Sequence, residues 1–523
     1  MKQLLFIGLF FFAQVSASQI SQTARWEREL KNSSHNYTVI TMGNQGIALV
    51  HDKQKYESGK RFWEIIALDT LLKEKWTREV FVDNRYNFIG HDYRDGYLYF
   101  LFRFGETDTG DLKIIKMGGG NEVFETHDYD PQLSIKLTHF NIMENKAILA
   151  GYISAEPAIL LFDVSTDQGK IIPGLFVKNT QMLDARVNAN NTFNVVLSES
   201  PSKVKKKLVI KTFDHTGTLL LDDAIEVESN KTILSAVTST LIRDELLIAG
   251  TWSEGIGQQA AGFFTVTVDP YNDQKINYYD FVQLNHFLDY LTPKRQAKTK
   301  AKAERRRNQG KVPDYRVGAS AVRVEETSKG FLFLLEAYSS TTQLNNYNRG
   351  FSNPFYGMPY PYGFYPGVGY PYRLYNSPYY YNSYAPGFNN AGTVDIKMLQ
   401  TSIVVLDAKG NLLYDHGCNL NEIKTASSEQ ISDFVESNDK ITIVASKEKE
   451  IFWQLSQRDG LPLTTEKNTI QLNSPIETIR SDDDAATVRH WYQKQMMVYG
   501  YQTIKNPERG NRDVFFINKI EVN

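Results

Sequence analysis

The amino-acid sequence predicts an all-β fold, a single closed β-propeller of eight four-stranded blades. Three observations predict it. A hairpin unit recurs along the chain, a short aliphatic strand precedes most copies of that unit, and the two ends of the chain complement one another. The aromatic fraction of 13% is high and favours β structure. A seven-bladed ring with one degenerate repeat is the alternative.

The hairpin unit is clearest at residues 402–415. A β-branched and aliphatic run over 403–406 suits a pleated sheet, and Gly410 can supply the positive φ of a tight turn. Copies lie roughly 47 to 60 residues apart, except across one long gap, and this period is typical of propeller blades. The other copies are 64–76, 112–126, 159–172, 208–223, 262–278, 451–464 and a truncated last copy at 514–522.

The strand before each hairpin is aliphatic and does not alternate, which is expected for strands packed on both faces by neighbouring blades. These strands are 97–102, 147–151, 246–250, 331–335, 441–445 and 496–500. The last repeat lacks an outer strand, and residues 24–30 resemble the outer strand at 75–80. We therefore expect residues 24–30 to complete the last blade and to close the ring.

The first residues predict export. Lys2 precedes an apolar run over 4–13, and small residues end at Ala17, so residues 1–17 form an expected signal peptide before a propeller at 18–523. The run is too short to span a bilayer, and no later stretch qualifies. Cys418 is the single cysteine, which excludes an intrachain disulfide. The expected location is the bacterial periplasm, the outer surface or the extracellular space.

Two insertions interrupt the repeats, and the first, at 279–317, is basic and helical. Apolar residues within 280–291 have helical spacing, which predicts one helix. Thr292 and Pro293 resemble an N-cap and a first helical position, and a second helix is expected over 293–309, ending at Gly310. The candidate anion-binding residues are Lys294, Arg295, Lys298, Lys300, Lys302, Arg305, Arg306 and Arg307.

The second insertion, at 339–392, consists mainly of Tyr, Pro, Gly and Asn. Frequent prolines oppose helix and sheet, so a disordered loop is expected. Its aromatic rings could stack on sugars or on one another. The candidate binding residues are Tyr360, Tyr362, Tyr365, Tyr370, Tyr372, Tyr379, Tyr380 and Tyr381. Both insertions are expected to emerge on one face of the disc, close together.

The hairpins resemble the repeats of pyrroloquinoline-quinone-type, or quinoprotein-like, β-propellers. The likeness lies in Ala67, Leu68, Asp69 and Trp76, and in Val405, Leu406, Asp407 and Gly410. It implies the propeller fold. This superfamily includes quinoprotein dehydrogenases and non-enzymatic envelope scaffolds. No repeat carries the complete pattern, and one cysteine cannot form the vicinal disulfide that such dehydrogenases often have. The resemblance therefore implies the scaffold branch and no catalytic residue.

The functional hypothesis is an exported binding or scaffold protein of the cell envelope that contacts an anionic polymer or a protein partner through one face. The alternative is an enzyme, a quinoprotein-like oxidoreductase or a hydrolase, with its site in the central channel. His416 and Cys418 could form a base and a nucleophile, although a buried cysteine is the commoner arrangement. No catalytic, metal or cofactor residue is assigned. A formal charge of −2 does not favour a nucleic-acid partner.

Overall fold

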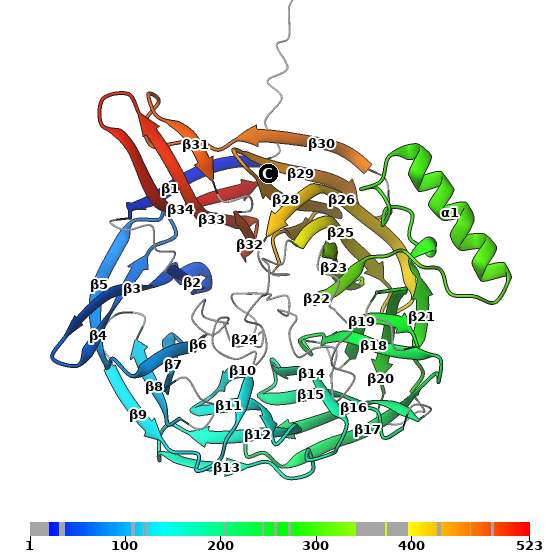
Figure 1. Cartoon of the computed structure of the whole chain (residues 1–523), viewed down its shortest axis with the longest axis horizontal. Coiled ribbons are helices and arrows are strands. Elements are labelled where there is room, and N and C mark those ends of the chain that lie inside the picture. Colours follow the sequence, from blue (N-terminus) through cyan, green and yellow to red (C-terminus); the bar gives the residue numbers. More distant parts are fainter. Residues whose placement is uncertain are drawn as a thin grey trace, which may run out of the picture.

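The computed structural model describes residues 20–30, 37–105, 110–118, 120, 124–202, 205–242, 245–255, 259–269, 274–340, 372–373, 396–425, 430–460, 462–482 and 486–523. Eight antiparallel sheets stand around a central axis, and the chain passes from one to the next in order (Figure 1). The prediction of an eight-bladed propeller is confirmed. The expected signal peptide at 1–17 lies outside the described residues.

Each of the first four blades runs from an inner strand at the axis to an outer strand at the rim. Blade 1 contains β2 (Tyr37–Thr41), β3 (Ile47–Glu57), β4 (Lys60–Leu68) and β5 (Glu74–Asp83). Blade 2 contains β6 (Tyr86–Arg94), β7 (Tyr97–Phe104), β8 (Leu112–Gly118) and β9 (Phe124–Tyr129). Blade 3 contains β10 (Lys136–Met143), β11 (Lys146–Ile153), β12 (Glu156–Asp163) and β13 (Gln168–Ile171). Blade 4 contains β14 (Thr180–Val187), β15 (Thr192–Glu199), β16 (Lys206–Asp214) and β17 (Leu219–Val227).

The last four blades follow the same plan, with an additional strand in blade 8. Blade 5 contains β18 (Lys231–Thr238), β19 (Leu246–Glu254), β20 (Gly262–Val268) and β21 (Asn277–Asp280). Blade 6 contains β22 (Gly318–Thr327), β23 (Gly330–Ser340), β25 (Ile396–Leu406) and β26 (Leu412–Thr425). Blade 7 contains β27 (Asp433–Ser437), β28 (Lys440–Lys447), β29 (Glu450–Gln457) and β30 (Pro462–Thr469). Blade 8 contains β31 (Thr478–Asp482), β32 (Thr487–Tyr492), β33 (Gln495–Asn506), β34 (Gly510–Val522) and β1 (Ile20–Glu29).

Strand β1 is the outer strand of blade 8, so the two ends of the ring share one sheet. It pairs antiparallel with β34, with Trp26 opposite Ile517. The Trp26 side chain is buried, and its Nε1 donates a hydrogen bond of 3.1 Å to Glu74 of blade 1. The shared sheet therefore joins the first and last repeats through backbone pairing and through a contact to the next blade.

The hydrophobic core lies between blades. Each of the eight neighbouring pairs shares at least one cluster of buried apolar side chains, including the pair formed by blades 8 and 1. Strand β23 is typical, because Phe331 to Ala337 are all buried. This burial on both faces explains why the strands that precede the hairpins show no alternation of apolar and polar residues.

Aspartates at the hairpin tips organise the turns that define the repeat. The Asp407 carboxylate accepts hydrogen bonds of 2.8 Å from the backbone N–H groups of Lys409 and Asn411, and Gly410 has a φ of +76°. Asp69 and Asp214 accept the same two bonds in blades 1 and 4. The aspartate that follows the strand is therefore a structural residue of the turn.

The first insertion differs from its prediction in one part. Where the apolar spacing predicts a helix over 280–291, the chain forms a short 3-10 helix, η2 (Phe281–Gln283), followed by turns. The N–H groups of Asn285 and His286 donate to the Asp415 carboxylate of β26, at 2.8 and 2.7 Å. Because these amides bond across the structure, they do not form helical bonds to carbonyl groups four residues earlier.

The second expected helix is present as α1 (Pro293–Asn308), which lies on the outer rim (Figure 1). The second insertion follows Ser340 of β23. Its expected disorder concerns residues outside the described part, apart from Tyr372 and Arg373. These two form β24, which pairs with Phe140 and His139 on the inner strand of blade 3.

Candidate anion-binding surface

The candidate binding surface is the basic face of α1. The helix carries eight Lys and Arg side chains against Glu304 alone. Five of these cations, hereafter the cationic stripe, are exposed and share one side of the helix: Lys294, Arg295, Lys298, Lys302 and Arg305. At about 100° per residue these positions fall within roughly 100° of the helix circumference, and they extend over ~17 Å along its axis.

The opposite side of α1 attaches the helix to the propeller. Ala303 is buried in the cluster shared by blades 5 and 6, which includes Phe281 and Leu288. Gln296 donates a hydrogen bond of 2.8 Å to Asp289, and Lys300 donates one of 3.0 Å to the carbonyl of Asn285. One buried alanine and a few polar contacts thus fix the orientation of the helix and leave the cationic stripe in solvent.

Both ends of α1 have recognisable caps. Pro293 occupies the first turn after Thr292, although the Thr292 side chain makes no capping hydrogen bond. At the other end Gly310 has a φ of +67°, as the sequence predicts. Its N–H donates to Arg307, and the N–H of Lys311 donates to Arg306, which is the Schellman pattern. Arginines in the last turn also interact favourably with the helix dipole.

Polar side chains of blade 6 hold the base of the insertion. Asp415 receives the two backbone N–H groups described above, and Asn419 donates a hydrogen bond of 3.3 Å to the carbonyl of Asp289. His286 Nδ1 lies 2.9 Å from Asp289 Oδ2. The hydrogen bond to Asp289 raises the pKa of His286 above its ordinary value, against the opposing effect of burial. The base of the arm therefore contains a titratable ion pair next to the first turn of α1.

The remaining predicted cations have other surroundings. Lys300 and Arg306 are half-buried and bind backbone carbonyls, since Arg306 Nε donates a hydrogen bond of 2.9 Å to Val312. Arg307 is exposed, but it lies outside the cationic stripe. The arm is connected to the core, because Ala303 belongs to an interblade cluster. Arg306 helps to hold the arm and is unsuitable for a variant meant only to alter surface charge.

The structure places one of the predicted tyrosines, and only its backbone. Tyr372 lies in β24 at the inner edge of blade 3, whereas α1 lies on the rim (Figure 1). The described part of the loop therefore does not lie beside the arm. The other seven lie outside the described residues: Tyr360, Tyr362, Tyr365, Tyr370, Tyr379, Tyr380 and Tyr381. A joint cationic and aromatic face stays a prediction.

Cys418 and His416 occupy neighbouring buried positions on β26. Burial raises the pKa of the Cys418 thiol to about 12, and burial lowers the pKa of His416 to about 4. A buried thiol with a raised pKa lacks the thiolate character of a nucleophile. The structure thus agrees with the interpretation of Cys418 as a core residue.

A second polar arrangement, which sequence reasoning missed, lies on the inner strands. Asp92, Asp184 and Asp433 each accept a backbone N–H from the inner strand of the following blade, at 2.6, 3.1 and 2.8 Å. Asp433 also pairs with the buried Arg323, at 2.9 Å. Each of these inner strands carries several polar residues, so no single one of them marks an interblade bond in the sequence.

No group of three or more His, Cys, Asp or Glu side chains among the described residues is arranged to hold a metal ion. Over the same residues, no helix combines the length and the apolar character needed to cross a membrane.

The comparisons with known proteins return solved structures alone. No protein-family model matches the chain. No curated protein matches it either. Similar structures include the polysaccharide lyase Uly1, with 8% identity over 95% of this chain and 100% of that one, and a TM-score of 0.39. The β-propeller domain of the Trilobed protease from Pyrococcus furiosus has 9% identity over 84% of this chain and 96% of that one, and a TM-score of 0.34. Prolyl oligopeptidase B from Galerina marginata has 8% identity over 90% of this chain and 56% of that one, and a TM-score of 0.39. This similarity is too low to carry a function to this chain.

Proposed function

We propose that this protein is an exported binding or scaffold protein of the cell envelope, and that the cationic stripe of α1 contacts an anionic polymer. The observation that carries the proposal is the position of the five cations on the solvent side of a helix whose other side is attached to the ring. A helix that were only a solvated linker would need neither the buried Ala303 nor a complete C-cap.

The composition of the exposed face favours a polymer over insertion into a bilayer. Helices that lie in a membrane surface bury a row of large apolar side chains. Between the cations of the stripe, α1 exposes alanine and polar side chains only, such as Ala297 and Ala301. Five charges in a row over ~17 Å instead suit the repeated anionic groups of an extended chain.

The proposal is tested with a variant that converts the five stripe residues, Lys294, Arg295, Lys298, Lys302 and Arg305, to Gln. Dextran sulfate serves as the polyanion, and dextran serves as its uncharged counterpart. Exposed ion pairs contribute roughly 0.2–1 kcal/mol each, so the variant should bind dextran sulfate roughly tenfold or more weakly at low salt. The difference should shrink as salt screens the charges. Isothermal titration calorimetry over a salt series measures both effects.

A matched variant controls for net charge. Lys60, Lys73, Lys75, Lys170 and Lys178 are exposed in blades 1 and 3 and in the segment before blade 4. Converting these five to Gln removes the same charge from other parts of the molecule, and binding should stay near that of the parent. Equal binding by the stripe variant and the parent at every salt concentration would show that α1 is a solvated insertion without this role.

The enzyme alternative, with a quinoprotein-like site in the channel, has no residue assigned to it. Among the described residues no set of His, Cys, Asp or Glu fits a metal such as calcium. The single Cys418 cannot form a vicinal disulfide. Addition of pyrroloquinoline quinone with calcium, followed by thermal unfolding, tests this alternative directly, because a bound cofactor would raise the melting temperature.

A further inference from the structure

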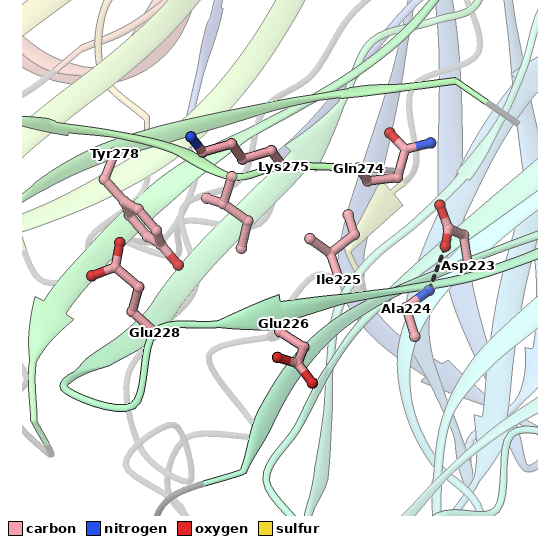
Figure 2. Close-up of a pocket in the computed structure, with 9 residues that line it drawn as sticks. Asp223, Ala224, Ile225, Glu226, Glu228, Gln274, Lys275 and Tyr278 are labelled. Carbon is pink, nitrogen blue, oxygen red and sulfur yellow. Dashed lines mark hydrogen bonds between the residues drawn. The ribbon is translucent and has the colours of Figure 1, made fainter. Parts of the chain in front are cut away.

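Carboxylates at the rim of blade 4 lie next to cations. In the groove between blades 4 and 5 (Figure 2), Glu228 pairs with Lys231, and Glu226 lies opposite Lys207 of β16. These groups are balanced in charge and in contact with solvent. Two carboxyl groups that lie between blades in the interior of the ring have neither advantage.

The first of them, Glu336 of β23, connects blade 6 to the segment that leads into blade 7. Its Oε1 accepts hydrogen bonds from the N–H groups of Ile431 and Ser432, at 3.3 and 3.1 Å, and from the Ser432 hydroxyl, at 2.5 Å. That hydroxyl lies 2.6 Å from the hydroxyl of Thr401. Within the described part of the chain, the buried Oε2 has no hydrogen-bond partner and Glu336 forms no ion pair.

This polar contact divides the apolar packing between blades 6 and 7. Leu334, two residues before Glu336, belongs to one apolar cluster, and Tyr338, two residues after it, packs on another. Thr401 and Cys418 continue the row of Glu336 across β25 and β26. The interface therefore consists of two smaller apolar clusters with a carboxyl group between them, so its stability depends on the state of that group.

The second group, Asp92 of β6, makes a similar contact between blades 2 and 3. Its carboxylate accepts the N–H of Ile142 of β10 at 2.6 Å and that of Tyr93 at 2.8 Å, and Tyr99 of β7 lies opposite it. Asp92 is buried, and it forms no ion pair among the residues that the structure describes. Four blades separate the two interfaces on either path around the ring, so they lie opposite one another (Figure 1).

Burial without a counter-charge opposes the ionisation of a carboxyl group. Burial raises the pKa of Glu336 to about 7 and the pKa of Asp92 to about 6. The hydrogen bonds favour the ionised forms, as do the charge of Arg489 near Glu336 and that of Arg94 near Asp92, while Asp95 opposes ionisation of Asp92. In both groups the effect of burial is the larger one.

These carboxyl groups stabilise the closed interfaces at low pH. Below the pKa of an exposed carboxyl group, about 4, each is protonated whether its interface is closed or open. As pH rises, the open form ionises first, so the free energy of opening falls until pH has passed the pKa of the closed form.

We propose that Asp92 and Glu336 form a proton-linked hinge, at which the ring loosens between blades 2 and 3 and between blades 6 and 7 as pH rises. The two halves of the ring, blades 3 to 6 and blades 7, 8, 1 and 2, then gain freedom to move relative to one another. The interface between blades 7 and 8 differs, because Arg323 supplies a buried counter-charge to Asp433. The proposal goes beyond polymer binding, since it assigns a conformational change to the ring.

Hydrogen exchange of the full chain at about pH 5 and about pH 8, corrected for intrinsic rates, tests the loosening. The amides of Ile142, Ile431 and Ser432 should lose protection roughly tenfold or more at the higher pH. Amides of β15, which lies inside blade 4, should keep the same protection. Equal protection of the three amides at both pH values overturns the proposal.

Variants assign the effect to each residue. Glu336→Gln keeps an oxygen that accepts hydrogen bonds but cannot ionise, so it should remove the pH dependence between blades 6 and 7 and preserve it between blades 2 and 3. Asp92→Asn should do the reverse. Glu450→Gln is the matched control, because Glu450 pairs with Lys467 at the surface, and it should behave like the parent. A variant that retains the pH dependence at its own interface contradicts the role of that residue, and exchange of the parent decides the test if a variant does not fold.

Spin labels measure the movement of the two halves. Cys418 is buried, so cysteines introduced at exposed positions can be labelled selectively. Glu226→Cys in blade 4 with Lys75→Cys in blade 1 spans the hinge, whereas Lys170→Cys in blade 3 with Lys409→Cys in blade 6 lies within one half. Distances from double electron–electron resonance should broaden between about pH 5 and about pH 8 for the first pair only. Broadening in both pairs, or in neither, would rule out the hinge.

Discussion

At the scale of the residue, aspartate has two structural roles in this propeller. At hairpin tips it accepts hydrogen bonds from the backbone N–H groups of a turn. In Asp407 these bonds lower the pKa of the carboxyl by more than burial raises it. For Asp407, burial would raise the pKa, but bonds from Asn411 and from the backbone hold the pKa below its ordinary value. On inner strands, Asp433 accepts the N–H of His490 and pairs with Arg323, so one fully buried carboxylate connects blades 6, 7 and 8.

Asp433→Asn should destabilise the protein, because the buried Arg323 would lose its fully buried counter-charge and keep only the partly exposed Glu325. Breaking a buried ion pair from one side costs roughly 3–5 kcal/mol. Chemical denaturation monitored by circular dichroism measures the loss. Asp439→Asn is the control, since Asp439 pairs with Lys329 at the surface, and it should leave stability nearly unchanged. Equal stability of the two variants would contradict the role of Asp433.

At the scale of the element, the arm is held by polar contacts at its base and by one buried alanine. Asp289 connects the segment before α1 to the helix itself, because it binds His286 and also Gln296 in the first turn of α1. The charges of Asp415 and Lys300 also affect the pKa of His286, because Asp415 raises it and Lys300 lowers it. The base of the arm therefore contains one ion pair, between His286 and Asp289, whose strength depends on the protonation of the histidine.

The base of the arm should loosen as pH rises. The pKa of His286 is raised in the folded protein, so its ion pair with Asp289 stabilises fully below the ordinary histidine pKa of about 6.5. The contribution is lost as pH rises through the raised folded pKa. Hydrogen exchange of residues 285–300, corrected for intrinsic rates, should show less protection at about pH 9 than at about pH 6. His286→Gln should remove this pH dependence, and a parent with equal protection at both values would contradict the assignment.

At the scale of the whole molecule, stability depends on a closed ring. Every blade packs on two neighbours, so an opened blade 8 would expose the cluster shared with blade 1, which includes Trp26, Tyr37 and Phe515. Ion pairs add to this closure, because Arg512 of β34 binds Glu27 of β1 and also Glu477. The strand β1 thus completes a sheet and covers an interblade core.

Removal of residues 24–30 should lower the melting temperature of the whole propeller, since blade 8 would lose its outer strand. Thermal unfolding followed by circular dichroism measures this change. Trp26→Ala is a milder version that keeps the backbone, and loss of a buried Trp costs roughly 3–5 kcal/mol. A truncated protein with an unchanged melting temperature would show that β1 is dispensable for closure.

The repeat pattern by itself predicted the hairpins and eight blades, with seven as the alternative, and the structure decided for eight. The residues that form a turn or a buried strand are close together in the chain, and the same pattern recurs in each blade. The turn at Asp407 and Gly410 and the aliphatic run of β23 could therefore be recognised from a single sequence. The Gly310 cap and the helix after Pro293 were predictable for the same reason. Local signals were enough for these elements.

Only the tertiary structure decided which polar groups meet. The apolar spacing over 280–291 is that of a helix, yet Asp415, more than 120 residues later, accepts the amides that a helix would use internally. Likewise, the cationic residues were evident in the sequence, but their division into an exposed stripe and the anchoring Lys300 and Arg306 was not. Such long-range contacts have no local signature, because they depend on how the blades are placed around the ring.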